Sequence, residues 1–178
     1  RMSSIKTELI MAAGRATRMA PLTESIPKPM APYGGTTLIA NGIDRLARSI
    51  EHIYVTVGYK KAMLALHVIE HGASGVFNTD GKGNAWWLYG TLLRQLDEPI
   101  LVLTADNVME LDLGLIYEDY IKLGMPACML VPVKPVDGLE GDYIFHENSC
   151  VTSLSRMDKA DIYCSGIQVV NPMLVNRL

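Results

Sequence analysis

The sequence predicts an α/β protein, with a Rossmann-like three-layer αβα sandwich around a mostly parallel mixed sheet. Short apolar runs alternate along the chain with longer segments whose apolar residues recur at helical spacing. The run Ile100–Thr104 (ILVLT) is apolar up to its last residue, which is typical of a central strand covered on both faces. Strand–helix alternation of this kind requires right-handed crossovers, which place helices on both faces of a parallel sheet.

Strands are expected where short apolar runs end at turn residues. The second run, for example, ends at Gly58. The five runs of this kind are Thr7–Ala12, His52–Val57, Ser74–Asn78, Ile100–Thr104 and Ala127–Val133. Beyond them the pattern changes to strand-like runs separated by short turns, which is typical of antiparallel strands. These later strands are expected at Asp142–His146, Cys150–Ser155 and Asp161–Val170.

Helices are expected between the strands. The clearest is Thr36–Ser49, because Ile39, Ile43 and Leu46 recur at helical spacing. Gly72 follows the next helix in the position of a C-cap. The other helices are expected at Lys60–His71, Asn84–Leu96 and Leu113–Leu123. Within the third, Trp86 and Trp87 point about 100° apart, which favours one core and one rim residue over a cage for a quaternary ammonium group.

Size and composition favour one domain over residues 1–178. The chain is long enough to bury a core, and its apolar (49%) and charged (20%) shares are ordinary for a globular protein. A formal net charge of −3 gives no electrostatic reason to expect nucleic acid or an anionic membrane as a partner. No apolar run reaches the roughly 18–20 residues that span a bilayer.

The cysteines and histidines suggest no metal or disulfide chemistry. Cys128, Cys150 and Cys164 have no CxxC spacing, and we expect buried, reduced thiols in a cytoplasmic protein. His67 and His71 are four residues apart on an expected helix and can share a face. Because no carboxylate or cysteine stands at a suitable spacing, a solvated helix face is favoured over a metal site.

The strongest functional signal is the segment 9–30, LIMAAGRATRMAPLTESIPKPM. A strand runs into a small-residue turn, where Gly14 permits a close backbone approach. Arg18 and Lys28 follow ten residues apart on a loop that contains three prolines. Backbone N–H groups at a strand end and two nearby cations suit phosphate groups. The segment therefore indicates nucleotide chemistry, with a surface loop carrying two solvated cations as the alternative.

Two further loops are expected at the same edge, because ligands bind beyond the carboxyl ends of parallel strands. Gly83 and Asn84 lie in DGKGN directly before the third expected helix, where Asn84 could instead act only as the helix N-cap. Asp106 follows ILVLT, and a carboxylate there could hold Mg²⁺ against a triphosphate or simply form a turn. The joint occurrence of the three loops favours a ligand site.

These residues resemble the sugar-phosphate nucleotidylyltransferases, also called nucleoside-diphosphate-sugar pyrophosphorylases. The family's AAGxGxR, PLT and PKP motifs correspond to AAGRATR at 12–18, PLT at 21–23 and PKP at 27–29. Gly83-Asn84 resembles the family's Gly-Thr or Gly-Asn pair. The resemblance spans nearly the whole chain and implies the nucleotide-diphospho-sugar transferase fold.

Later motifs are similar to the compact bacterial branch that includes N-acetylmuramate-1-phosphate uridylyltransferases. The features that fit are Gly141-Asp142-Tyr143 and the late Ser165-Gly166-Ile167, which resembles the strand that borders the sugar. The triplet Ala-Asp-Asn at 105–107 is closer to the phosphocholine cytidylyltransferases.

Two departures from the family pattern are visible. Ala16 stands in place of the family's second glycine. The second metal aspartate, which the family carries past the Ser-Gly-Ile strand, has no counterpart after Asn171. We therefore expect that C-terminal or other family segments are missing from the single domain.

The resemblance implies Mg²⁺-dependent transfer of a nucleoside monophosphate from a nucleoside triphosphate to a sugar 1-phosphate, with release of pyrophosphate. In this interpretation Arg18 binds the β and γ phosphates, and Lys28 bridges the α-phosphate and the attacking phosphate. The remaining implied residues are Ala12, Ala13, Gly14, Gly83 and Asn84 for the nucleotide, Gly141 and Gly166 for the acceptor and Asp106 for Mg²⁺. The alternatives are a cytidylyltransferase acting on phosphocholine or a similar phospho-alcohol, and a catalytically impaired nucleotide-binding domain. The base, the acceptor and the oligomeric state stay open.

Overall fold

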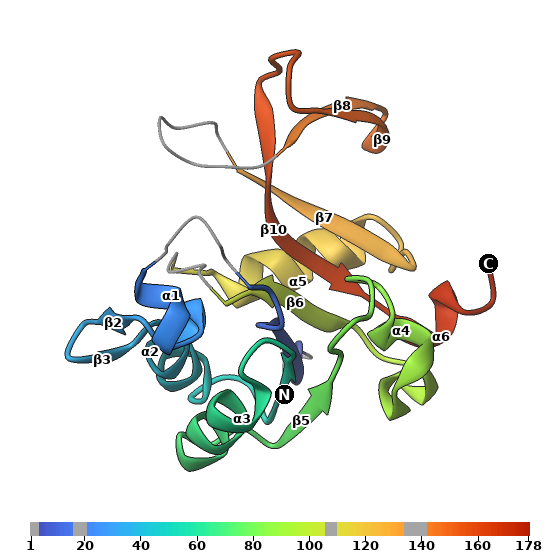
Figure 1. The fold of residues 1–178 in the computed structure, drawn as a ribbon. Helices are drawn as coiled ribbons and strands as arrows, with labels where there is room; N and C mark the ends of the chain where they lie inside the picture. The colour runs from blue at the N-terminus through green and yellow to red at the C-terminus, as the bar shows by residue number, and fades with distance from the viewer. Residues whose placement is uncertain (1–3, 16–20, 106–109, 134–141) are drawn as a thin grey trace.

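The predicted α/β class is confirmed by a computed structural model, which describes residues 4–15, 21–105, 110–133 and 142–178 (Figure 1). One mixed sheet runs in the order β5-β4-β1-β6-β10-β8-β9, and β7 pairs with β10 beside this path. The eight longer strands predicted from the sequence begin and end within one residue of the observed ones.

The part of the sheet nearest the N-terminus is parallel. Its members are β1 (Thr7–Met11), β4 (His52–Val57), β5 (Gly75–Asn78) and β6 (Ile100–Thr104). β1 lies between β4 and β6, and Met11 is in register with Thr56 on one side and Thr104 on the other. The carboxyl ends of these three strands are therefore level at one edge of the sheet.

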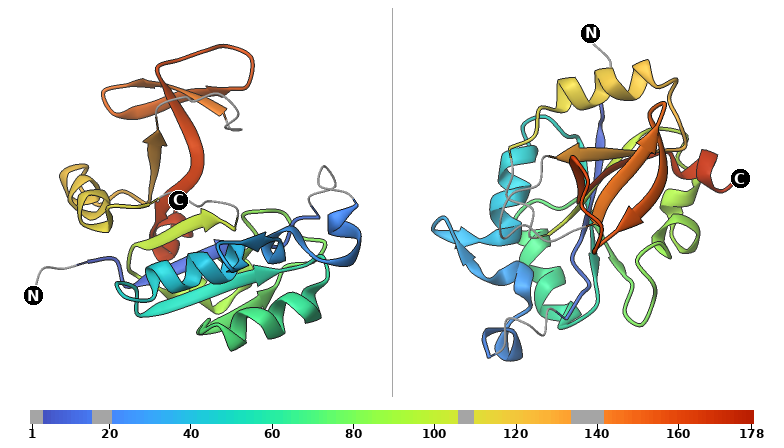
Figure 2. Two further views of the ribbon diagram at one scale, coloured as in Figure 1. Left: turned by 90° about the vertical axis from the view of Figure 1, so that its left-hand side faces the viewer. Right: turned by 90° about the horizontal axis from the view of Figure 1, so that it is seen from above.

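The tail is antiparallel, as predicted. The long strand β10 (Ile162–Val170) pairs with β6 through its C-terminal half and with β8 through its N-terminal half. β7 (Cys128–Val133) also pairs with β10, and β8 (Asp142–Glu147) forms a hairpin with β9 (Cys150–Ser155). The hairpin projects away from the body of the sheet, and β10 joins the two parts (Figures 1 and 2).

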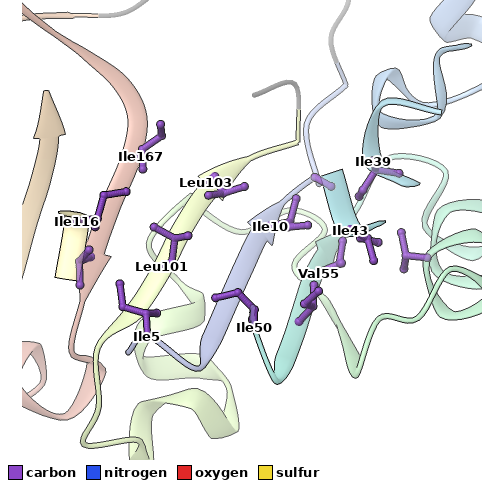
Figure 3. Packing of buried hydrophobic residues seen from close by; sticks show 14 of the residues in the cluster. Ile5, Ile10, Ile39, Ile43, Ile50, Val55, Leu101, Leu103, Ile116 and Ile167 are labelled. Carbon is purple, nitrogen blue, oxygen red and sulfur yellow. The ribbon is translucent and has the colours of Figure 1, made fainter. Parts of the chain in front are cut away.

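Helices cover both faces of the sheet and complete the three layers. On one face, apolar residues of α2 (Leu38–Leu46), α3 (Lys61–Glu70) and α5 (Leu113–Lys122) pack on the strands (Figure 3). On the other face lie α4 (Trp87–Gly90), the 3-10 helix η3 (Leu92–Gln95) and α6 (Pro172–Val175). Successive strand residues supply the two cores in turn: Ile10 belongs to the first and Leu9 to the second. None of the helices in the described ranges is both long enough and apolar enough to cross a membrane.

Several short elements lie between β1 and α2. They are the helix α1 (Leu22–Ser25), the 3-10 helix η2 (Lys28–Met30) and the two-stranded sheet of β2 (Pro32–Tyr33) and β3 (Thr36–Thr37). Thr37 is the N-cap of α2, because its hydroxyl accepts a hydrogen bond from the Ala40 amide at 3.2 Å. The predicted helix over 36–49 is therefore shorter than expected.

The prediction of one helix over Asn84–Leu96 is wrong. Thr91 has extended backbone angles (φ −120°, ψ 172°) and separates α4 from η3. Its hydroxyl donates to the Trp87 carbonyl at 2.7 Å and accepts from the Leu93 amide at 3.2 Å. These local hydrogen bonds compete with continuation of the helix. Asn84 is not a helix N-cap either, since that position of α4 is occupied by Trp86.

Two side-chain predictions have different outcomes. The core-and-rim interpretation of the tryptophans is confirmed, because Trp87 is buried while half-buried Trp86 lies under the Lys82 ammonium at 5.4 Å. The expected burial of Cys128 and Cys150 is wrong, because both residues are exposed. Alternation along β7 places Met129 in the core and leaves Cys128 exposed on the opposite face. Among the described residues, neither Cys128 nor Cys150 is in a disulfide, the Cys128 thiol donates to the Gln168 side-chain oxygen at 3.5 Å, and the side chain of Cys164 is not described.

Candidate functional site

A small cavity of about 140 Å³ opens where β1 and β6 end. It brings together three segments that the sequence placed at one edge: the β1 loop, the PKP turn and the end of ILVLT. The residues that line it are Met11, Ala12, Gly14, Lys28, Pro29, Thr104 and Ala105. We call it the small cavity. Of the residues predicted for the nucleotide and for catalysis, Ala12, Gly14 and Lys28 meet here.

Backbone hydrogen bonds hold the loop after β1 between its two neighbouring strands. The Ala12 amide donates to both the carbonyl and the hydroxyl of Thr56, each at 3.2 Å. The Ala13 carbonyl accepts from the Tyr59 amide at 3.1 Å, and Met11 accepts from Ala105 at 3.1 Å. Gly58 allows this approach, since a Cβ there would lie 2.9 Å from the Ala13 carbonyl oxygen. The loop therefore begins from a fixed position.

Gly14 differs from Gly58 in what surrounds it. A Cβ added to Gly14 would meet no protein atom within 4 Å in the described structure. The protein's own packing therefore leaves space at Gly14, and this space borders the small cavity.

Lys28 stands on a rigid turn at the wall of the small cavity. Pro27 precedes η2 with φ −69°, and its carbonyl accepts from the Met30 amide at 2.9 Å. The flanking prolines are both buried, and Lys28 itself is half-buried. The Ala31 carbonyl accepts from Leu38 at 3.0 Å, which connects the turn to the start of α2. The ring constraints and this anchor fix the backbone from which the ammonium group extends.

Gly166 lies beside the small cavity through its contact with Thr104. Its φ of +77° is in the left-handed region, and an added Cβ would lie 3.2 Å from Thr104 Cγ2. The pairing of β10 with β7 shifts register between Cys164 and Gln168, which marks an irregularity around this glycine. Glycine is therefore favoured here by its backbone conformation and by the close neighbour.

A larger cavity, of about 650 Å³, lies on the other side of the β1 loop. We call it the basic cavity, and it is lined by Ala13, Arg15, Gly58, Tyr59, Lys60, Lys61, Ala62, Met63 and Asp80. Sequence reasoning missed its lysines. The available signal was GYKK directly after the strand His52–Val57, because the strand-end rule applies there as well.

Three cations and one carboxylate set the charge of the basic cavity. The Arg15 guanidinium and the Lys60 ammonium lie 5.1 and 5.5 Å from the centre of the Tyr59 ring. Lys61 pairs with Asp80 at 3.3 Å, and both side chains are about half-exposed. The cavity therefore carries a net positive charge.

The remaining predicted site residues lie elsewhere or outside the described ranges. Gly83 and Asn84 are exposed and line neither of these two cavities. Arg18, Asp106 and Gly141 lie outside the described residues. In the part that the structure describes, no three His, Cys, Asp or Glu side chains gather in a way that could hold a metal ion.

Comparison with known proteins identifies the family. The sequence profile of the nucleotidyl transferases matches residues 7–139, which include β1, Lys28 and β6. This chain belongs to the nucleotidyl transferase family. Curated relatives of this family member include the bifunctional protein GlmU of Methanococcus aeolicus, which is 32% identical over 64% of this chain. The mannose-1-phosphate guanyltransferase of Pichia angusta is 27% identical over 94% of it.

The nucleotidyl transferase chain spans only part of these relatives, 28% of the GlmU protein and 50% of the guanyltransferase. Solved structures show the same fold. HddC from Yersinia pseudotuberculosis has a TM-score of 0.76, with 17% identity over 98% of this chain and 80% of its own. A UDP-glucose pyrophosphorylase complexed with UDP-glucose has a TM-score of 0.68, with 19% identity over 94% of this chain and 76% of its own.

Proposed function

We propose that this protein transfers a nucleoside monophosphate from a nucleoside triphosphate to a sugar 1-phosphate and releases pyrophosphate. The observation that carries the proposal is the meeting of Lys28, Ala12, Gly14 and Ala105 around the small cavity. A fixed cation, a strand-end loop and the residue before Asp106 are thereby gathered at one point. The names of the relatives support sugar phosphates as acceptors, since one is a mannose-1-phosphate guanyltransferase and another a UTP–glucose-1-phosphate uridylyltransferase.

The proposed reaction is an in-line displacement at the α-phosphorus. A phosphate oxygen of the acceptor forms the new P–O bond, the bond to the α,β-bridging oxygen breaks, and its electron pair leaves with pyrophosphate. No protein nucleophile is required, so the protein acts by holding two anions together and offsetting their repulsion. Lys28 would contact both the α-phosphate and the attacking phosphate. Arg18 would stabilise the leaving pyrophosphate.

Asp106 is the proposed ligand of Mg²⁺. A carboxylate is a hard oxygen donor that suits this ion, and Asp106 directly follows Ala105, which lines the small cavity. When bound, the ion would neutralise charge on the triphosphate.

The nucleotide and the acceptor are proposed to approach from different sides. Ala12, Ala13 and Gly14 would contact the nucleotide through their backbones, with Gly83 and Asn84 towards the base and ribose. Gly166 borders the small cavity through Thr104, and with Gly141 it would line the acceptor pocket. Because nucleoside triphosphates are cytoplasmic metabolites, we propose that the protein acts there.

A substrate panel tests the proposal directly. The chain, extended by any natural flanking sequence, is incubated with Mg²⁺, each nucleoside triphosphate and a set of sugar 1-phosphates together with phosphocholine. We expect pyrophosphate release for at least one pair that contains a sugar 1-phosphate. Pyrophosphate release with phosphocholine and with no sugar 1-phosphate would mean that the acceptor is a phospho-alcohol and not a sugar phosphate. Nucleotide binding without pyrophosphate release from any pair would contradict transfer and leave a nucleotide-binding domain.

A further inference from the structure

The small cavity is smaller than a usual small-molecule site. It measures about 140 Å³, whereas small-molecule sites usually measure roughly 300–1,000 Å³. The basic cavity, about 650 Å³, is on the other side of the same β1 loop, because Ala13 and Arg15 line it while Ala12 and Gly14 line the small one. The two cavities therefore share the β1 loop as a common wall.

The side chains of the basic cavity suit a multiply charged anion. Arg15, Lys60 and Lys61 contribute three positive charges against the single carboxylate of Asp80. The same Tyr59 ring lies within cation–π distance of both the Arg15 guanidinium and the Lys60 ammonium. Lys60 is half-buried and has a φ of +51°, so its backbone is held in a conformation that few non-glycine residues adopt. An uncharged base or sugar would not need this concentration of positive charge.

We propose that the basic cavity binds the terminal phosphates of the nucleoside triphosphate and retains them as pyrophosphate after transfer, with Lys60 and Lys61 as binding residues beside Arg15. This inference rests on the proposed function, and it adds residues of the strand β4 loop to Arg18. The negative charge that develops on the leaving oxygen when the α,β-bridging bond breaks would be stabilised by these cations.

The test measures binding of inorganic pyrophosphate by calorimetry, without nucleotide, acceptor or divalent metal. The double variant Lys60→Asn/Lys61→Met removes two charges, and Asn tolerates the positive φ at position 60. We expect its pyrophosphate affinity to fall about tenfold or more, as for lost hydrogen bonds to charged groups. The control Lys122→Met, in the last turn of α5, should stay within about twofold, because it removes a charge that lines neither cavity.

A second variant predicts a change of opposite sign. Asp80 holds Lys61 at 3.3 Å, so Asp80→Asn frees that lysine and removes the negative charge. Pyrophosphate should then bind more tightly, by about two- to fivefold. Affinity for a nucleoside monophosphate should be the same in all variants.

Unchanged pyrophosphate affinity in the double variant would overturn this inference, even if the substrate panel shows transfer. A loss of monophosphate or nucleoside affinity in its place would also overturn it, because the cavity would then hold the base. Conversely, pyrophosphate binding that depends on the two lysines, with no transfer for any substrate pair, would support the anion site and refute the proposed function. Thermal unfolding of each variant establishes that it is folded.

Discussion

At the scale of single residues, Lys28 is the side chain on which the proposed chemistry depends most. It is half-buried on a turn with prolines on both sides, and it lines the small cavity. We predict that Lys28→Ala lowers the transfer rate by at least about 100-fold, as loss of one preorganised electrostatic group does. Pyrophosphate release in a steady-state assay is the measurement, and Lys122→Ala is the control for loss of a charge. A near wild-type rate in Lys28→Ala would refute the assigned role.

Glu8 is a second residue with a measurable consequence, although it lies away from the site. It is fully buried in β1 and neither of its carboxylate oxygens has a hydrogen-bond partner, so burial raises its pKa from 4.5 to about 8. The folded protein therefore retains this proton to a higher pH than the unfolded chain does. Stability is fully present below pH 4.5 and is lost as the pH rises towards 8.

We predict that this carboxyl alone lowers the free energy of unfolding by about 3 kcal/mol between pH 5 and pH 8. Glu8→Gln should remove that loss, because the amide does not titrate. Urea titrations of both proteins at the two pH values provide the comparison. If the two pH profiles run parallel, the carboxyl at position 8 is ionised in the folded state.

At the scale of elements, β10 connects the sheet to the edge of the small cavity through Gly166. Gly124, which follows α5, offers a matched control: its φ of +80° is close to the +77° of Gly166, but an added Cβ there would meet no described atom within 4 Å. Alanine should cost about 1–2 kcal/mol of stability at either position because of the positive φ. Only Gly166→Ala should also displace Thr104. We predict a higher KM for the acceptor in that variant and an unchanged KM in Gly124→Ala.

A hydrogen bond also couples the helices α2 and α3. The Thr37 hydroxyl caps α2 through Ala40 and lies 2.7 Å from Nε2 of His67, whose ring is 4.6 Å from that of His71. Thr37→Val should lower the free energy of unfolding by about 1–2 kcal/mol, because it removes both interactions. Chemical denaturation at pH 7.5 measures this loss. A difference below a few tenths of a kcal/mol would mean that the cap does not contribute.

The contact of His67 with Thr37 and His71 also predicts how stability changes with pH. Desolvation lowers the pKa of His67, and the charge of His71 lowers it further, against an opposing effect of Glu70. The unfolded chain therefore takes up this proton first as the pH falls below 6.5. Its contribution to stability is present above that pH and decreases as the pH falls, which is opposite in sign to the effect of Glu8.

At the scale of the whole molecule, the elements that follow the hydrophobic pattern could be predicted and those set by local polar contacts could not. Strand boundaries were recovered because alternation and turn residues mark them. The break at Thr91 depends on two hydrogen bonds of one hydroxyl, which residue spacing does not encode. Exposure of Cys128 depends on which face of β7 meets the core, and an apolar run does not reveal this.

For the candidate site, the sequence predicted the residues that lie in motifs and not those brought in by tertiary contacts. The strand-end rule together with the AAG and PKP motifs brought Ala12, Gly14 and Lys28 to one cavity. The same rule covers the loop after β4, where Lys60 and Lys61 lie, but no motif marks these two lysines. Their position beside Arg15 follows from the close contact between Gly58 and Ala13, a tertiary feature that no local motif contains.

The β8–β9 hairpin and the parallel part of the sheet should differ in local stability. β9 is exposed along nearly its whole length, whereas β1 is buried between two strands. We predict that amide hydrogens of β9 exchange much faster than those of β1, since opening the hairpin exposes little apolar surface. Hydrogen–deuterium exchange with peptide-level resolution measures both. Equal protection would mean that the hairpin opens only when the whole domain unfolds.

The short loop from Ala12 to Arg15 separates the two cavities, because its residues line both of them. This arrangement limits which substitutions can change the substrate preference of one cavity alone. Its backbone is tied to both neighbouring strands, so a substitution that moves it would disturb both cavities together. Changes at Lys60 and Lys61, or at Gly166 behind Thr104, would alter one cavity and leave the other in place. We therefore expect that substitutions outside the loop can change the substrate preference of one cavity at a time.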